Sequence, residues 1–166
     1  MKPRFDPWRG IVPAAALIAL ASCSAEPAAE PPPAHHRDVV QPEGLARLPV
    51  FSTAIRNGDV LWMSGQIGAL PGVTPPTLVE GGVEAQTRQA FANIESVLTA
   101  AGLGLGDLVK CTVFLADIAD YAAMNAVYAT YFEGMDPPAR SALAGSGLAL
   151  GARVEIECIA AYPPGH

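Results

Sequence analysis

Residues 108–132 read LVKCTVFLADIADYAAMNAVYATYF, and the change of pattern within this stretch indicates the fold class. Apolar and polar side chains alternate over Leu108–Leu115, which is typical of a strand with one buried face. From Asp120, a residue suited to a helix N-cap, apolar and aromatic residues recur at helical spacing. The members of this stripe are Tyr121, Met124, Tyr128, Tyr131 and Phe132. The stretch therefore predicts a strand followed by an amphipathic helix.

The residues before this stretch predict a hairpin and another helix. Two apolar runs, Pro49–Arg56 and Val60–Ile67, are separated by residues 57–59, whose sequence Asn-Gly-Asp is a strong turn signal. Apolar residues then recur at helical spacing over Val83–Ala101, and Gly102 ends that helix. The hairpin and the helix precede the strand at 108–115.

The residues after it predict two further strands, which complete the element order. The Pro137-Pro138 pair ends the second helix, and strands follow around Ser141–Leu143 and over Ala152–Ala161. The order β-β-α-β-α-β-β predicts an α+β fold with two helices on one face of a mixed sheet. The other face still needs cover for Trp62, Phe114 and Ile159. Another subunit is the expected cover.

The N-terminus has the features of an export signal. Met1–Arg9 is basic, Gly10–Ala21 is almost wholly apolar, and Leu20-Ala21-Ser22-Cys23 resembles the bacterial lipobox. We expect residues 1–23 to be a lipoprotein signal, lipidated at Cys23, and a signal peptide cut elsewhere is the alternative. Residues 24–44 are Pro/Ala-rich and predict a tether, followed by a domain over 45–162 and a tail over 163–166. The expected location is the cell envelope, facing the periplasm, with membrane contact only through the lipid.

Charge, histidine and cysteine content limit the binding partners, metal sites and cross-links that the chain can have. The net charge is −6, and the basic residues of the domain are scattered singly, which argues against a nucleic-acid partner. His35-His36 lacks a third metal ligand, so no metal site is expected. Cys111 and Cys158 each lie in an apolar strand pattern. An oxidising compartment permits a disulfide between them, but the sequence favours free buried thiols and leaves the pairing open.

Two short segments carry the candidate chemistry. Arg140, behind the Pro137-Pro138 pair and at a strand start, is suited to clamp a carboxylate through two hydrogen bonds. Glu155, on the last strand, can orient or deprotonate water. The alternative is a surface ion pair between these two side chains.

These segments belong to a set of motifs that spans the domain. In chain order they are Pro49-Val50-Phe51-Ser52, Ser64-Gly65-Gln66-Ile67, Gln86-Thr87-Arg88, Asn93-Ile94, Lys110-Cys111-Thr112-Val113-Phe114, Asn125-Ala126-Val127-Tyr128, Pro138-Ala139-Arg140-Ser141 and Val154-Glu155-Ile156-Glu157. Over Leu48–Ala161 the chain closely resembles the RidA (YjgF-type) family.

The resemblance implies a chorismate-mutase-like fold and a homotrimer with ligand clefts between subunits. It also implies hydrolysis of 2-imino acids, such as 2-iminopropanoate and 2-iminobutanoate, to 2-oxo acids and ammonia without a cofactor or metal. By the same resemblance, Arg140 clamps the substrate carboxylate and Glu155 positions the attacking water. The other site residues that it implies, for substrate binding, are Phe51, Ser64, Gly65, Asn125 and Ala142.

A second hypothesis is a non-catalytic carboxylate-binding or holdase-like envelope protein with the same fold. Phe51 stands where many deaminating members have a tyrosine, so a hydroxyl is missing there. The segment Ala142–Leu150 is small and Gly-rich where archetypal members carry larger residues. Turnover that depends on Glu155 would distinguish the enzyme from the binding protein.

Overall fold

The computed structural model describes residues 37–45 and 47–165. The strands are β1 (Arg37–Val40), β2 (Ala54–Asn57), β3 (Val60–Met63), β4 (Gln66–Ile67), β5 (Leu108–Leu115), β6 (Ala139–Ala144) and β7 (Val154–Ala161). The helices are α1 (Gly82–Ala100) and α2 (Tyr121–Thr130), and short 3₁₀ turns cover Leu105–Asp107, Ile118–Asp120 and Ala149–Gly151. The proposed lipidation site Cys23 and His35-His36 lie outside the described residues.

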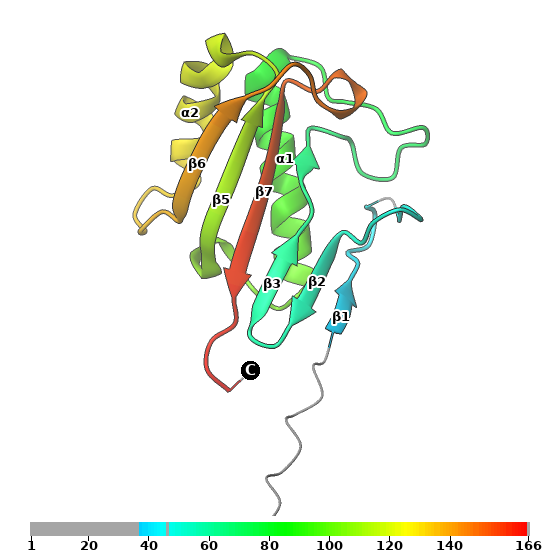
Figure 1. The fold of residues 1–166 in the computed structure, drawn as a ribbon, viewed down its shortest axis with the longest axis vertical. Coiled ribbons are helices and arrows are strands. Elements are labelled where there is room, and N and C mark those ends of the chain that lie inside the picture. The colour runs from blue at the N-terminus through cyan, green and yellow to red at the C-terminus, as the bar shows by residue number, and fades with distance from the viewer. Residues whose placement is uncertain (1–36, 46, 166) are drawn as a thin grey trace, which may run out of the picture. The chain divides into compact units, whose positions relative to one another are not determined.

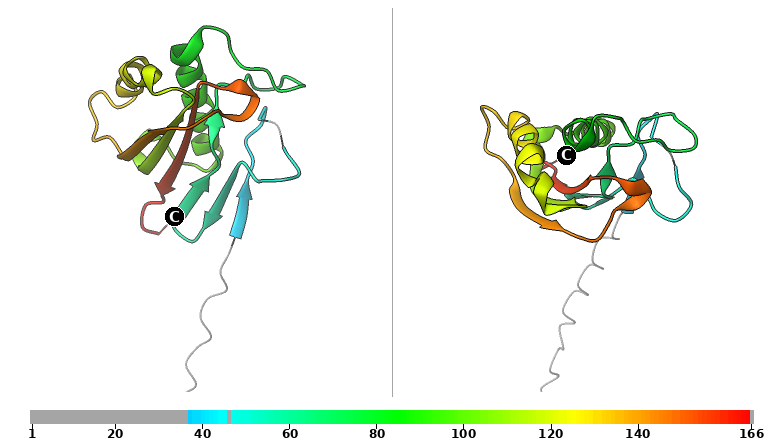
Figure 2. Two further views of the ribbon diagram at one scale, coloured as in Figure 1. Left: turned by 45° about the horizontal axis from the view of Figure 1, so that its top comes forward. Right: turned by 90° about the horizontal axis from the view of Figure 1, so that it is seen from above.

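One mixed sheet organises these elements. The strand order is β1-β2-β3-β7-β5-β6, and β4 also pairs with β7. Only the β5–β6 pair is parallel among the described strands. Both helices lie on the same face of the sheet, as the views from the side and from above show (Figures 1 and 2). The predicted arrangement of two helices on one face of a mixed sheet is confirmed.

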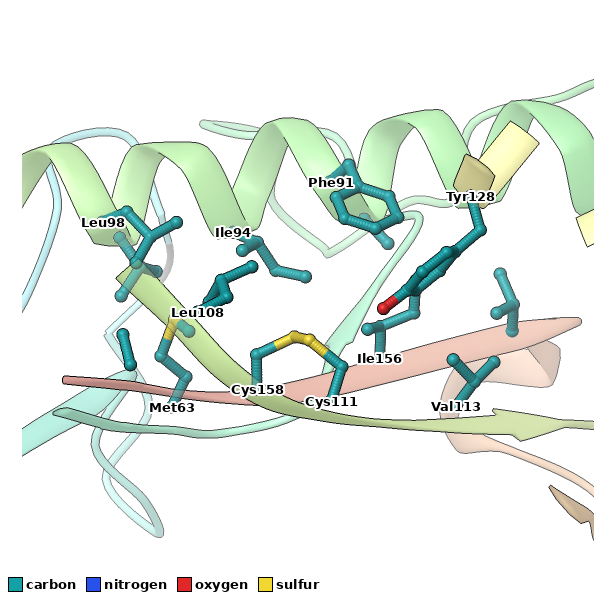
Figure 3. Close-up of a cluster of buried hydrophobic side chains, with 14 of the residues drawn as sticks. Met63, Phe91, Ile94, Leu98, Leu108, Cys111, Val113, Tyr128, Ile156 and Cys158 are labelled. Carbon is teal, nitrogen blue, oxygen red and sulfur yellow. A yellow bond between two sulfur atoms is a disulfide. The ribbon is translucent and has the colours of Figure 1, made fainter. Parts of the chain in front are cut away.

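The core lies between the helices and the central strands. Phe91, Ile94 and Leu98 of α1 are fully buried and face Val113 of β5 and Ile156 of β7 (Figure 3). Burying a side chain of this size contributes about 1.5–3 kcal/mol relative to exposure. The alternation predicted for Leu108–Leu115 therefore has a direct cause, because Cys111, Val113 and Leu115 all face the helices.

The two cysteines form a disulfide in this core, so the preference for free thiols was wrong. Cys111 and Cys158 are direct partners on the antiparallel strands β5 and β7, with a Cα–Cα distance of 4.1 Å. The bond lies beneath α1 and is buried (Figure 3). The pairing depends on strand register, which residues 47 positions apart in the sequence do not reveal.

Three details of the fold, two in the sheet and one at the start of α2, differ from the sequence expectations. Arg37–Val40, expected in the tether, forms β1 and pairs with β2. The first hairpin strand begins at Ala54 and not at Pro49, and Gly58 takes a positive φ of 60° in the two-residue turn. Asp120 precedes α2 but does not cap it, because its carboxylate accepts two hydrogen bonds of 2.7 Å from Arg153.

The sheet face away from the helices carries apolar side chains in adjacent rows. Trp62 pairs with Ile159, and Phe114 pairs with Leu143. Trp62 is 51% exposed and Leu143 is 47% exposed in the single chain. None of the helices in the described ranges is both long enough and apolar enough to cross a bilayer.

Candidate active site

Arg140 lies on the helix-covered side of β6. Its register partner on β5 is the buried Cys111, so the guanidinium points towards α2. There its central carbon lies 4.5 Å from the ring centroid of Tyr128, and Nη2 donates a hydrogen bond of 3.2 Å to the Tyr121 hydroxyl. Stacking on an aromatic face holds a guanidinium in place while leaving its in-plane donors available.

A hollow of about 350 Å³ opens beside this guanidinium. Asn125 and Tyr128 of α2 line it, together with Phe132, Pro138 and Arg140. No acidic side chain lines the hollow, and Arg140 forms no ion pair with any residue in 37–45 or 47–165. Ala142 lies two residues further along β6, on the same face of the strand. This half of the candidate site therefore presents one cation against largely apolar walls.

The remaining predicted residues form a second cluster around Glu155. The Ser64 hydroxyl donates a 2.8 Å hydrogen bond to the Ser52 carbonyl, which ties the loop that carries Phe51 to the β3–β4 connection. Gly65 packs directly on Glu155, and a Cβ atom there would overlap the carboxylate. Phe51 itself is 51% exposed.

The Glu155 carboxyl has a perturbed acidity. Partial burial raises its pKa above the usual value, and the negative charge of Glu157 raises it further. Both residues lie on the sheet face away from the helices, because they alternate with the buried Val154, Ile156 and Cys158. A carboxylate with a raised pKa holds a proton more firmly and is a stronger base than an ordinary glutamate.

Arg140 and Glu155 do not meet within one chain. Arg140 shares the helix side with Cys111, whereas Glu155 pairs with Phe114 on the opposite side. The ion pair considered as an alternative for these two residues is therefore excluded within the chain. The structure brings Arg140, Asn125 and Ala142 together on one side, and Phe51, Ser64, Gly65 and Glu155 on the other.

Comparison with known proteins identifies the family. The family model described as Endoribonuclease L-PSP, which is the YjgF/RidA family, matches residues 43–162. The chain belongs to this family. It is 41% identical over 119 residues to a rat 2-iminobutanoate/2-iminopropanoate deaminase, covering 72% of this chain and 85% of the rat protein. It is 45% identical over 112 residues to a RutC family protein of Pyrococcus horikoshii, covering 66% of this chain and 85% of that protein.

Solved structures of RidA relatives share the fold. A conserved Rid family protein from Yersinia pestis has a TM-score of 0.72 at 38% identity, over 76% of this chain and 99% of that one. The TdcF protein of E. coli with bound serine has a TM-score of 0.69 at 29% identity, over the same shares of the two chains. The predicted chorismate-mutase-like α+β fold is thereby confirmed.

Sequence reasoning missed several residues that support the two halves of this RidA-family site. Tyr121 and Tyr128 hold Arg140, but their place in the apolar stripe of α2 marked them only as core residues. The buried Gln66 donates a 2.9 Å hydrogen bond to the Ser64 carbonyl and so fixes the turn at Gly65. The signal available for Gln66 was an amide between apolar strand residues, which has to find a partner when buried.

Proposed function

We propose that this RidA-family protein hydrolyses 2-imino acids to 2-oxo acids and ammonia, in a site shared by two copies of the chain. The observation that carries the proposal is the stacked Arg140 guanidinium, which has no acidic partner in the described chain and lies in a hollow with largely apolar walls. A substrate carboxylate would supply the missing negative charge through two charge-assisted hydrogen bonds. The curated relatives named as imine deaminases support the same reaction class.

The reaction requires little beyond positioning. The substrate carboxylate binds Arg140, which orients the C=N group. A water molecule held by Glu155 adds its oxygen to the imine carbon, and its proton passes through the carboxylate to the nitrogen. In the resulting carbinolamine, the hydroxyl proton moves through the same carboxylate to the nitrogen as the C–N bond breaks, leaving the 2-oxo acid and ammonia. Fixing the water and the imine at reacting distance converts a bimolecular step into a local one, which is a large rate contribution.

The site would be completed by a neighbouring copy. Since Arg140 and Glu155 lie on opposite faces of the sheet, an Arg140 half-site from one copy would face a Glu155 half-site from the next. The exposed apolar rows around Trp62 and Leu143 would supply a surface for such contact. We propose the homotrimer expected from the sequence as this assembly. Its cell-envelope location, through a lipid on Cys23, is proposed on the sequence alone.

The decisive experiment couples the full chain to an L-amino-acid oxidase that releases 2-iminobutanoate or 2-iminopropanoate. Semicarbazide gives the same semicarbazone with the imine and, more slowly, with the oxo acid, so the quantity measured is the initial rate of semicarbazone formation, followed by absorbance. We expect the protein to lower this rate and Arg140→Ala to abolish the effect, with the exposed Arg88→Ala as a control. An initial rate equal to that without protein would refute the proposal.

A carboxylate-binding protein without turnover is the second candidate. It is favoured by the exposed ring of Phe51, which brings no hydroxyl to the Glu155 half-site. Such a protein would bind 2-oxobutanoate, and the ligand would raise the melting temperature of the protein. The rate of imine hydrolysis would stay the same as without protein. Turnover lost in Glu155→Ala would exclude it.

A further inference from the structure

Two buried amide side chains of α1 lie behind the Glu155 half-site, and neither has a direct part in the proposed reaction. Gln86 is 7% exposed and Asn93 is 4% exposed. Both lie in motifs by which the domain resembles the RidA family. A buried amide destabilises a fold unless its hydrogen bonds are made, so the partners of these two groups show which segments they hold.

The Gln86 side chain contacts both strands that meet at Glu155. Its Oε1 accepts a hydrogen bond of 2.8 Å from the backbone N–H of Arg153, two residues before Glu155. Gly68 packs on the same side chain so closely that an added Cβ there would lie 2.7 Å from the Gln86 Cβ. Gly68 directly follows β4, whose Ile67 is the register partner of Glu155. Gln86 therefore joins α1 to the start of β7 and to the end of β4.

Asn93 lies two turns further along α1 and holds β4 a second time. Its Nδ2 donates hydrogen bonds of 3.1 Å to the Ile67 carbonyl and 3.0 Å to the Ala69 carbonyl. Gln89 donates a 2.9 Å hydrogen bond to the Asn93 Oδ1 and so orients the amide. Strand β4 has only two residues, which is shorter than usual, and its pairing with β7 supplies few hydrogen bonds. The hydrogen bonds from α1 are therefore a large part of what fixes β4 against β7.

We propose that Gln86 and Asn93 are positioning residues for the reaction, which hold Glu155 against Gly65 in the place that water addition requires. The inference rests on the proposed function, in which Glu155 holds the water. Both amides belong to the helix side of the sheet, whereas Glu155 faces away from it, so they act through the backbone of β4 and β7. Gly65 immediately precedes β4, and a shift of β4 would therefore move Gly65 relative to the Glu155 carboxylate.

Loss of either amide should lower kcat and leave substrate binding intact. Gln86→Met keeps the stem that Gly68 contacts and removes the acceptor for Arg153, and Asn93→Leu removes both donors to β4. A displacement of about 1 Å at a catalytic group can cost about 10²-fold in rate, and we expect a loss of this size in kcat for each variant. KM should stay at the value of the parent chain, because the carboxylate clamp at Arg140 is not part of this support.

Two further variants separate positioning from a loss of stability. Thr87 is fully buried in the same helix, and its hydroxyl donates a 2.7 Å hydrogen bond within α1, to the Val83 carbonyl. Thr87→Val should therefore lower the melting temperature without lowering kcat. Gln86→Glu keeps the length and the accepting oxygen of the side chain and should recover part of the rate that Gln86→Met loses. A folded Gln86→Met or Asn93→Leu with the kcat of the parent would overturn the inference.

Hydrogen exchange, followed by mass spectrometry on peptides that cover residues 64–70, measures the support itself without turnover. We expect faster exchange in Gln86→Met and Asn93→Leu than in the full parent chain, since β4 opens more readily without its hydrogen bonds to α1. Thr87→Val should exchange like the parent in these peptides. Imine hydrolysis by the parent, with equal exchange and equal kcat in all variants, would refute the inference and leave the proposed function standing. A parent that hydrolyses no imine would refute the proposed function itself.

Discussion

The two faces of the sheet carry the two halves of the proposed site. On the helix side, Arg140 stacks on Tyr128, and its positive charge has no carboxylate partner among the described residues. On the open side, Glu155 packs against Gly65 and carries an acid whose pKa is raised. The first half suits binding of an anion, and the second suits proton transfer. In the proposed reaction the chemistry therefore depends on assembly, since neither face of one chain holds both groups.

The largest expected effect comes from removing the cation. Arg140→Ala should lower kcat/KM for imine hydrolysis about 10³-fold, equivalent to about 4 kcal/mol, because the substrate loses two charge-assisted hydrogen bonds in a partly desolvated site. Arg140→Lys should recover only part of the rate, since an ammonium cannot form the planar pair. A loss of less than 10-fold in Arg140→Ala would show that the carboxylate binds elsewhere.

The Cys111–Cys158 disulfide between β5 and β7 should affect the free energy of unfolding more than the rate of hydrolysis. Cys111 pairs with Arg140 across β5 and β6, and Cys158 lies in the same strand as Glu155. Closing a loop of this length stabilises a protein by about 4 kcal/mol. We expect Cys111→Ala/Cys158→Ala to lose roughly that much unfolding free energy in urea while the folded variant keeps its kcat/KM. Equal stability of the variant and the parent would contradict this expectation.

A single added methyl group at Gly65 should disturb the Glu155 half-site. In Gly65→Ala the new Cβ would overlap the Glu155 carboxylate and displace it. Displacement of a catalytic group by about 1 Å can cost about 10²-fold in rate, and we expect a loss of this size in kcat/KM. Gly104→Ala is the matched control, because no atom lies within 4 Å of a Cβ at that position. Equal kcat/KM values of the two variants would show that the position of Glu155 does not affect the reaction.

The smallest effect concerns the neighbouring acid. Because the Glu155 carboxylate is the proposed base, kcat/KM should fall as pH drops through its raised pKa. Glu157→Gln removes the smaller cause of the raised pKa and should move this acid limb to lower pH. Burial, the larger cause, remains in this variant. A limb that stays in place would show that another group controls it.

The same raised pKa has a consequence for stability. The folded state favours protonated Glu155, so ionisation of this carboxyl destabilises the fold once the pH rises above its unfolded pKa. The full cost applies above the folded pKa. Glu155→Gln should therefore raise the unfolding free energy at neutral pH and should not change it at pH 3, as urea titrations at both pH values would show. A variant less stable than the parent at pH 7 would contradict this sign.

Much of this arrangement follows from local sequence. Strand β5 was predicted with its observed bounds, because its alternation reflects burial against α1. Strand β1 was missed, since it has only four residues, two of them charged, and no periodicity marks them. Alternation along 154–161 puts Glu155 on the face opposite the buried Val154 and Ile156. The face of Arg140, however, depends on the register between β5 and β6. The Cys111–Cys158 bond depends on the register between β5 and β7.

Mixing two inactive variants tests the shared site most directly. Arg140→Ala and Glu155→Ala chains, unfolded and refolded together in equal amounts, would assemble at random. If each site takes Arg140 from one copy and Glu155 from the next, about a quarter of the sites contain both native residues. We predict imine hydrolysis at about a quarter of the parent rate in the mixture and none in either variant refolded alone. A co-refolded mixture that contains mixed oligomers but remains inactive would contradict the account.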